Sequence, residues 1–268
     1  MDVSVIIPTY KPDNYIFDCL DSICGQTLER DSYEVLVVLN GCDDPYRSMV
    51  EDYAGKHSET SIRVLHTDKK GVSAARNMGI DSSKGDYVCF IDDDDWISPS
   101  FLATLLSKGS RAVIPVSNCI MKDSEGNQKP HFLTIAYSKN EKKNNPGIFS
   151  LRSFYSSVCG KLIPTCLIGS IRFNENFALG EDSLFMFDIS YKVKEMVLAP
   201  ADAVYYIRQR ENSASRKSIH YSQKSKILTG LICSYCKAWL RHPFSYNFLF
   251  FISRLVATAS KFLIRNYR

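Results

Sequence analysis

The chain has 268 residues, of which 45% are hydrophobic and 23% are charged. This composition is ordinary for a globular protein and excludes disorder as the default, and the length suits one large α/β domain or one domain with an appendage. The net charge of +4 conceals a split, because residues 207–268 hold 12 Lys and Arg against one acid, whereas residues 1–206 hold 21 against 28. A basic tail could meet nucleic acid, an anionic membrane or an anionic substrate, and charge alone does not choose among them.

The N-terminal sequence MDVSVIIPTY enters a short apolar run without a basic region, so we expect neither a signal peptide nor a leading membrane helix. Four such β-branched runs lie at residues 3–8, 33–39, 62–66 and 87–91. Segments with helical character separate them, and this alternation predicts βαβ units on a mostly parallel sheet.

The helical segments carry start signals in chain order. Asp13 or Asn14 precedes the first, Asp44 and Pro45 the second, and Gly71 the third. Ser98 and Pro99 open a fourth helix, whereas the polar stretch 115–150 is expected to be rich in loops.

Three polar loops follow predicted strands, namely PTYKPD after the first, NGCDD after the second and DDDDW after the fourth. Because ligands bind beyond the carboxyl ends of strands in open α/β sheets, we expect these loops to converge. The four aspartates at 92–95 repel one another and raise each other's pKa, so the cluster calls for a cation or a charged ligand. A helix cap is the alternative, but a cap needs one aspartate rather than four.

The nine cysteines are odd in number and scattered. Only Cys233 and Cys236 have C-x-x-C spacing, and no second pair or histidines complete a zinc site. We therefore expect reduced thiols and a cytoplasmic protein.

Six segments occur in a characteristic order: VSVIIPTY, EVLVVLNGCDD, GVSAARNMGI, FIDDDDW, ALGEDSLF and YYIRQRENSAS. Together they resemble the motif set of the family 2 glycosyltransferases with the GT-A fold, over about residues 2–217. The resemblance implies a catalytic domain at 1–217, followed by a helical, basic extension at 218–268.

The resemblance also implies roles for the acidic cluster. Asp92 and Asp94 match a D-x-D element that binds a divalent cation, Mn²⁺ or Mg²⁺, which bridges the phosphates of a nucleotide-sugar. Asp94 is the expected metal ligand, Asp92 also approaches the ribose or a water on the metal, and Asp93 takes the variable position.

Further site residues follow from the same resemblance. The expected nucleotide-binding residues, besides Asp92 and Asp93, are Pro8, Thr9, Tyr10, Asn40, Arg76, Asn77, Arg208, Arg210, Ser213 and Ser215. Asp182 is the expected catalytic base and Glu181 an acceptor-orienting group, although an acidic pair before a helix, read alone, is more often a cap. Lys161 matches a recurrent position of less defined role.

Two positions depart from the family pattern. Lys11 stands where Asn is usual, and Leu39-Asn40 stand where an Asp pair is usual, whose first carboxylate accepts a hydrogen bond from uracil N3. Leu39 cannot accept that bond, whereas Asn40 could through its amide oxygen. The identity of the base therefore stays open.

The sequence favours an inverting, metal-dependent glycosyltransferase. The expected partners are a donor nucleotide-sugar, UDP-linked, and a saccharide or lipid-linked saccharide acceptor in cell-surface polysaccharide synthesis, with no nucleic acid. The alternatives are a phosphotransferase of the haloacid dehalogenase type, in which D-x-D follows the first strand, and a catalytically silent binding or scaffold protein. A donor-hydrolysis assay would separate the glycosyltransferase from the silent protein.

The last segment, 247–268, has no run of about 18 apolar residues, so we do not expect it to span a membrane. Arg254, Thr258, Lys261 and Arg265 would form one polar stripe on a helix, with apolar residues around the rest. One interpretation is a helix packed on the catalytic core. The other is a basic amphipathic helix that attaches the protein peripherally to the anionic inner face of the cell membrane.

Overall fold

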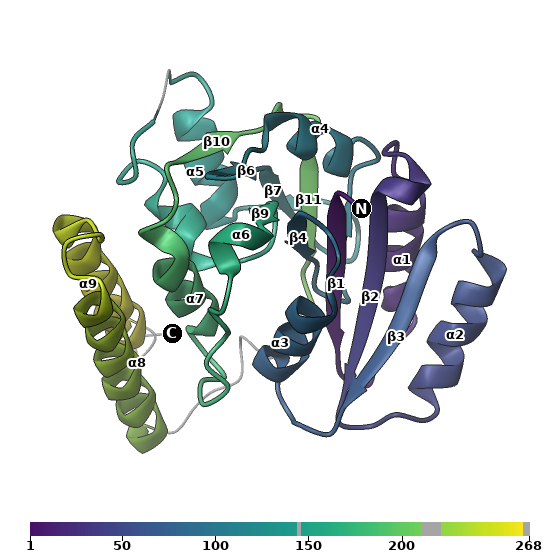
Figure 1. The fold of residues 1–268 in the computed structure, drawn as a ribbon, viewed down its shortest axis with the longest axis horizontal. Coiled ribbons are helices and arrows are strands. Elements are labelled where there is room, and N and C mark those ends of the chain that lie inside the picture. Colours follow the sequence, from purple (N-terminus) through teal and green to yellow (C-terminus); the bar gives the residue numbers. More distant parts are fainter. Residues whose placement is uncertain (144–145, 211–220, 265–268) are drawn as a thin grey trace.

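The central sheet has five strands in the order β3-β2-β1-β4-β9. A computed structural model of the chain describes residues 1–143, 146–210 and 221–264 (Figure 1). The strands are β1 (Val3–Thr9), β2 (Tyr33–Asn40), β3 (Ser61–Thr67), β4 (Tyr87–Phe90) and β9 (Ile163–Pro164). The first four pair in parallel, and β9 runs antiparallel to β4. These four parallel strands confirm the sequence prediction, and their apolar runs suit a sheet that is covered on its faces.

The helices between these strands also follow the sequence prediction. They are α1 (Tyr15–Cys24), α2 (Tyr46–Lys56), α3 (Val72–Ser82) and α4 (Phe101–Lys108). Helix α3 packs closely on the sheet because Gly79 has no side chain: a Cβ at that position would overlap the side chain of Ile6 in β1. This close approach fixes the helix that carries Arg76.

A second group of strands covers the region that was expected to be loop-rich, so that expectation is wrong. It forms a four-stranded sheet in the order β5-β11-β7-β8 and a pair of β10 with β6. The elements are β5 (Trp96–Ile97), β6 (Val113–Val116), β7 (Asn118–Lys122), β8 (Gln128–Lys129), α5 (Phe132–Asn140), β10 (Glu195–Leu198) and β11 (Val204–Arg208). Strand β7 pairs with β11 and β6 with β10. Such long-range pairing leaves no local pattern in the sequence.

The remaining elements are all helical. They are the 3₁₀ helices η1 (Arg30–Ser32) and η2 (Arg152–Ser156), and the helices α6 (Thr165–Ile168), α7 (Glu181–Ser190), α8 (Tyr221–Arg241) and α9 (Phe248–Ile264). Helices α8 and α9 lie side by side at the end of the molecule opposite β3 and α2 (Figure 1). Their side chains Leu231, Tyr235, Phe250 and Phe251 belong to the main hydrophobic core. The predicted domain boundary at residue 217 lies outside the described residues, so the division stays a prediction.

The described part of the polar stripe on the last helix faces the protein, in agreement with the interpretation of a helix packed on the core. Arg254 and Thr258 are only 4% and 8% exposed, whereas Leu249 and Val256 are 65% and 59% exposed. The cause is specific, because the Arg254 guanidinium donates to Ser156 Oγ at 3.2 Å, in η2. The side chains of Lys261 and Arg265 lie outside the described part. Within the described residues, no helix has the length and apolar character needed to cross a bilayer.

Candidate active site

The loops after β1, β2 and β4 meet at the carboxyl edge of the central sheet, as the sequence predicted. The Thr9 hydroxyl donates a short hydrogen bond to the Asp93 carboxylate. The Asn40 amide donates to the Thr9 carbonyl at 2.9 Å. These two contacts join all three strand ends in one place.

The acidic cluster divides into an internal carboxylate and more accessible ones. Asp95 is buried, and its carboxylate accepts hydrogen bonds from Tyr205 Oη at 2.7 Å and from the Arg208 N–H at 2.9 Å. Burial, and then the charges of Asp92 and Asp94, raise the pKa of Asp95 well above its usual range. Asp95 therefore anchors β11 beside the loop.

Burial is also the main cause of the raised pKa values of Asp93 and Asp94. The pKa of Asp93 is raised to about 7, with smaller contributions from the neighbouring aspartates, while the Thr9 hydrogen bond acts in the opposite direction. The pKa of Asp94 is raised by burial and by Asp92. The repulsion predicted from the sequence is present, but the loss of solvent around the carboxylates contributes more.

Two arginines lie against this cluster. Arg210 Nε is 2.5 Å from Asp94 Oδ2, and Arg208 Nε donates to the Asp94 carbonyl at 2.9 Å. The Arg208 guanidinium also lies over the Trp96 ring, 4.9 Å from its centroid. Both arginines therefore lie at the edge of the acidic cluster, and Arg208 also pairs with Asp18 at 2.7 Å. Ser213 and Ser215, predicted to act with them, lie outside the described residues.

The carboxylates suit a divalent cation that takes few protein ligands. The Asp92 side chain is 43% exposed and the Asp94 side chain 14% exposed. Within the described residues no group of three or more His, Cys, Asp or Glu side chains forms a complete metal site. Carboxylate oxygens are the hard ligands that Mg²⁺ and Mn²⁺ prefer, and these ions commonly complete their shell with substrate phosphate and water.

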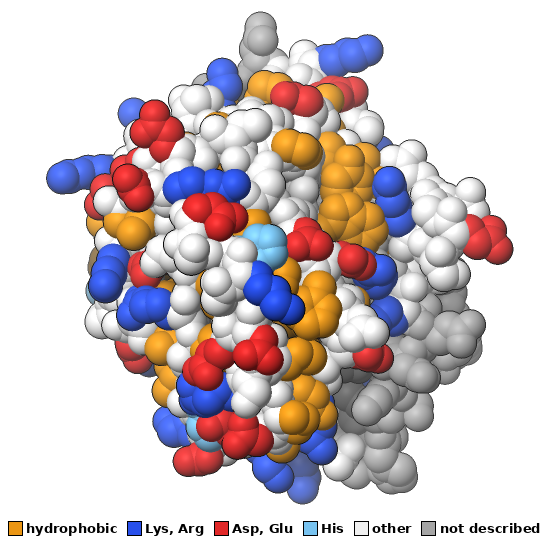
Figure 2. Space-filling view, turned by 90° about the vertical axis from the view of Figure 1, so that its right-hand side faces the viewer, with side chains coloured by type: hydrophobic (Ala, Val, Ile, Leu, Met, Phe, Trp, Pro, Cys, Tyr) orange, Lys and Arg blue, Asp and Glu red, His pale blue; other side chains and the backbone are white. Residues whose placement is uncertain are grey.

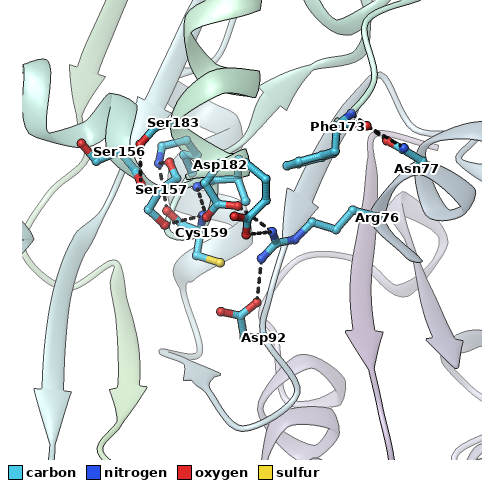
Figure 3. A network of polar contacts seen from close by, with 12 residues as sticks. Arg76, Asn77, Asp92, Ser156, Ser157, Cys159, Phe173, Asp182 and Ser183 are labelled. Atoms are coloured by element: carbon cyan, nitrogen blue, oxygen red, sulfur yellow. Dashed lines mark hydrogen bonds and ion pairs between the residues drawn. The ribbon is translucent and has the colours of Figure 1, made fainter. Parts of the chain in front are cut away.

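Arg76 connects the acidic cluster to the predicted base (Figure 3). Its guanidinium donates to Asp182 Oδ1 at 2.6 Å and to Asp92 Oδ1 at 3.0 Å, and lies 3.6 Å from Glu181 Oε1. Arg76 is only 3% exposed, and its charge lies 5.3 Å from the centroid of the Phe173 ring. Sequence reasoning assigned Arg76 to the nucleotide and missed this bridge, because the bridge depends on how α3 meets α7.

The start of α7 presents the acidic pair to Arg76. Gly180, at φ +84°, turns the chain into the helix, a conformation that favours glycine. The Val158 N–H lies 3.4 Å from Asp182 Oδ2. Burial and the Asp182 charge raise the pKa of Glu181 to about 7, although Arg76 lowers it. The two carboxylates thus have different surroundings: Arg76 and the Val158 N–H contact Asp182, whereas burial dominates at Glu181.

The chain matches the sequence profile described as glycosyl transferase family 2 over residues 4–162. It belongs to this family. The glycosyltransferase GlyA of Streptococcus pneumoniae is 34% identical over 227 residues, which are 80% of this chain and 31% of that protein. The poly(ribitol-phosphate) β-N-acetylglucosaminyltransferase TarS of Staphylococcus aureus is 28% identical over 218 residues, 79% of this chain and 36% of TarS. The chain thus spans about a third of the length of these relatives.

Solved structures show the same fold. Residues 1–349 of S. aureus TarS in complex with UDP-GlcNAc align with a TM-score of 0.74 and 22% identity, covering 100% of this chain and 73% of that one. A mannosyltransferase of Pyrobaculum calidifontis in complex with GDP-Man and Mn²⁺ aligns with a TM-score of 0.59 and 20% identity, covering 96% and 75%. The predicted GT-A fold, with helices at its C-terminal end, is confirmed.

Two residues of the family 2 motifs are engaged inside the protein. Asn40 Oδ1 accepts from the Gly71 N–H at 3.3 Å, while Asn40 Nδ2 donates to the Thr9 carbonyl. Asn77 donates to the Phe173 carbonyl at 3.0 Å and accepts from the Phe173 N–H at 2.8 Å. Both side chains are buried, and their hydrogen bonds link separate segments of the chain. Their assignment to the nucleotide stays a prediction that these contacts do not favour.

The remaining predicted residues differ in exposure. Pro8 is buried inside β1, whereas the Tyr10 ring is 54% exposed at the strand end. Lys161 is fully buried, and its Nζ donates to the Ser157 carbonyl at 2.6 Å and to the Cys159 carbonyl at 3.0 Å. Burial lowers the pKa of Lys161. Lys161 therefore holds the segment that carries the Val158 N–H to Asp182, a role that the motif alone did not reveal.

Proposed function

We propose that this chain is an inverting, metal-dependent glycosyltransferase that takes its sugar from a UDP-sugar. The observation that carries the proposal is the position of Arg76, which binds Asp92 of the D-x-D element and Asp182 of α7 at 3.0 and 2.6 Å. One guanidinium thus separates the donor-phosphate site from the base. Direct displacement requires the attacking hydroxyl and the leaving diphosphate to lie on opposite sides of one sugar carbon, and a base and a D-x-D element joined through one side chain are close enough to serve both groups.

The donor side consists of Asp92, Asp94, Arg208 and Arg210. Asp94 and Asp92 would hold Mn²⁺ or Mg²⁺, which supplies positive charge to the diphosphate as it leaves. The Mn²⁺ in the related mannosyltransferase structure supports this choice of cofactor. Arg210 pairs with Asp94 in the structure, and the same guanidinium suits paired hydrogen bonds to phosphate oxygens.

The base is Asp182. Arg76 fixes one carboxylate oxygen and the Val158 N–H faces the other, while the side chain remains 20% exposed. An acceptor hydroxyl that reaches the exposed part can transfer its proton to Asp182 as it attacks the sugar. Glu181 lies beside it, 12% exposed, and orients the acceptor.

The nucleotide lies against the ends of β1 and β2 in this proposal. Tyr10 presents an exposed ring on which a base can stack, next to Pro8 and Thr9. The UDP-GlcNAc complex of TarS supports UDP as the nucleotide. Leu39 has no acceptor and Asn40 uses its amide within the protein, so the uracil edge must be read by other groups.

The acceptor is a saccharide or a lipid-linked saccharide in the synthesis of a cell-surface polysaccharide. The relative TarS, whose name gives poly(ribitol-phosphate) as its acceptor, supports a cell-surface polymer. A phosphotransferase of the haloacid dehalogenase type is not supported, because the D-x-D element follows β4 rather than the first strand. A silent scaffold remains the alternative that the experiment must exclude.

The test replaces Asp182 by Asn. We expect Asp182→Asn to bind UDP-sugar with wild-type affinity and to lose transfer by about two to four orders of magnitude, the usual effect of losing a general base. Calorimetry measures binding, and release of UDP measures transfer. Asp188→Asn makes the same change on the same helix, away from the Arg76 contacts, and should keep wild-type activity.

Two outcomes would contradict the proposal. Transfer that survives in Asp182→Asn would place the base elsewhere. A wild-type chain that binds UDP-sugar with Mn²⁺ but neither transfers nor hydrolyses the sugar would be a scaffold.

A further inference from the structure

One face of α9 presents apolar side chains to solvent. We define the outer face of α9 as Phe248, Leu249, Ile252 and Val256, which are 55%, 65%, 39% and 59% exposed. Their spacing places them on one side of the helix. Just before the helix, Phe244 is fully exposed. Single exposed apolar residues are common, but a contiguous group of this kind marks an interaction site.

The opposite face of α9 explains why the apolar side chains stay outside. The Phe250 ring lies 4.9 Å from the Tyr155 ring, and Phe250 is only 1% exposed. The Arg254 guanidinium donates to the Arg152 carbonyl at 3.4 Å as well as to Ser156. A rotation that hid the outer face would remove Phe250 from the core and break these hydrogen bonds. The protein therefore holds the apolar face outward.

A groove continues the outer face. It has a volume of about 540 Å³ and lies between α9, with Leu249, Ile252 and Val256, and the segment that carries Phe149 and Arg152. The Phe149 side chain is 45% exposed. The lining is almost entirely apolar, with an arginine at its side, which suits a lipid better than a polar ligand.

The charge of the C-terminal region indicates which partner binds the outer face of α9 and the groove. No acidic residue occurs between positions 212 and 268, and helix α8, beside α9, exposes Lys226, Lys237 and Arg241. The opposite end of the molecule, formed by β3 and α2, carries interspersed acidic and basic side chains (Figure 2). A second copy of the chain would bring two basic surfaces together, whereas anionic lipid headgroups complement this one.

We propose that the outer face of α9 and the adjoining groove dock on the surface of an anionic lipid bilayer. Phe244, Leu249, Ile252 and Val256 enter the boundary between headgroups and acyl chains, and the basic side chains of α8 attract the headgroups. This places the helix in the interface with its apolar outer face toward the lipid and Arg254 toward the protein. The proposal does not depend on the proposed catalytic activity.

Vesicle sedimentation tests the proposal. The probes are vesicles of phosphatidylcholine alone and vesicles that contain about one third phosphatidylglycerol. We expect the chain to bind the anionic vesicles at low salt, to bind them less at high salt, and to bind the neutral ones weakly. The triple variant Leu249→Ser, Ile252→Ser, Val256→Ser should lose at least about tenfold in affinity.

A matched control is available on another helix. Phe132 and Ile135 of α5 are each 49% exposed, so Phe132→Ser with Ile135→Ser removes exposed apolar groups elsewhere and should leave binding unchanged. Trp239 gives a second measurement, because its ring lies 6.0 Å from that of Phe248. Its fluorescence should shift to the blue on addition of anionic vesicles. Circular dichroism verifies that each variant is folded.

Several results would overturn the proposal. The first is that the chain does not bind anionic vesicles at low salt. The second is that the folded triple variant binds them as well as wild type does. A third is a concentration-dependent dimer, without vesicle binding, that the triple variant abolishes, since this would identify a second copy as the partner.

Discussion

At the scale of single residues, Asp94 is central because it forms an ion pair with Arg210 in the structure and would bind the metal in the proposed reaction. Asp94→Asn removes one negative charge from a cluster in which burial and neighbouring charges raise the pKa of the carboxyls. We expect the fold to persist with an unchanged or slightly higher Tm, and Mn²⁺-dependent UDP affinity to fall at least about tenfold. Calorimetry with and without Mn²⁺ measures this. Asp52→Asn, at an exposed position of α2, is the control. If Asp94→Asn kept the wild-type Mn²⁺-dependent affinity for UDP, Asp94 would not be the metal ligand.

Glu181 should make the stability of the free protein depend on pH. Its pKa is raised from 4.5 to about 7, so between these values the folded chain binds this proton more tightly than the unfolded chain. The contribution of Glu181 to stability therefore falls as the pH rises from about 4.5 to about 7, and stays low above. We expect Glu181→Gln to be more stable than wild type at pH 8 and to differ less at pH 5. Urea unfolding at both pH values measures this, with the exposed Glu59→Gln as control. If the stability difference between Glu181→Gln and wild type were the same at pH 5 and pH 8, the result would contradict the raised pKa of Glu181.

At the scale of elements, the contact of α3 with β1 determines where Arg76 lies. Gly79→Ala would place a methyl group against Ile6, so we expect a loss of about 1–3 kcal/mol in the free energy of unfolding. Gly55→Ala on α2 is the matched control, because a Cβ there meets nothing within 4 Å. It should be neutral or stabilise by up to about 1 kcal/mol. Equal stabilities of the two variants would show that α3 can shift without cost.

The site itself is assembled from elements that are distant in the sequence. Arg76 of α3, Asp92 after β4 and Asp182 of α7 meet through one guanidinium, and Lys161 supports the segment beside them. Each element could be predicted from its own residues. Their meeting could not, because the register of α7 against α3 depends on tertiary packing.

At the scale of the whole molecule, the ligands that complete the acidic site should act together. Because the aspartates form no complete metal site in the described residues, Mn²⁺ alone should bind weakly, and UDP alone would lack the cation that is proposed to join its phosphates to the aspartates. We expect UDP and Mn²⁺ together to raise Tm by more than the sum of their separate effects. At about 100 times the Kd, the gain in stability is about 2.7 kcal/mol. Differential scanning fluorimetry measures it, with Mg²⁺ and Ca²⁺ for comparison. Additive shifts would argue against a shared metal and diphosphate site.

The sequence by itself determined the parallel sheet, the succession of its first four strands and their helices along the chain, and the family. It could do so because apolar periodicity, turn residues and the acidic motif after β4 are local signals. Tertiary structure alone decided that Arg76 bridges Asp92 and Asp182, that Asn40 and Asn77 are engaged internally, and that 115–150 contains β7, β8 and α5. It also decided which side of α9 faces outward. The helix pattern shows only that polar and apolar sides exist, whereas the hydrogen bonds of Arg254 to η2 select the side that is buried.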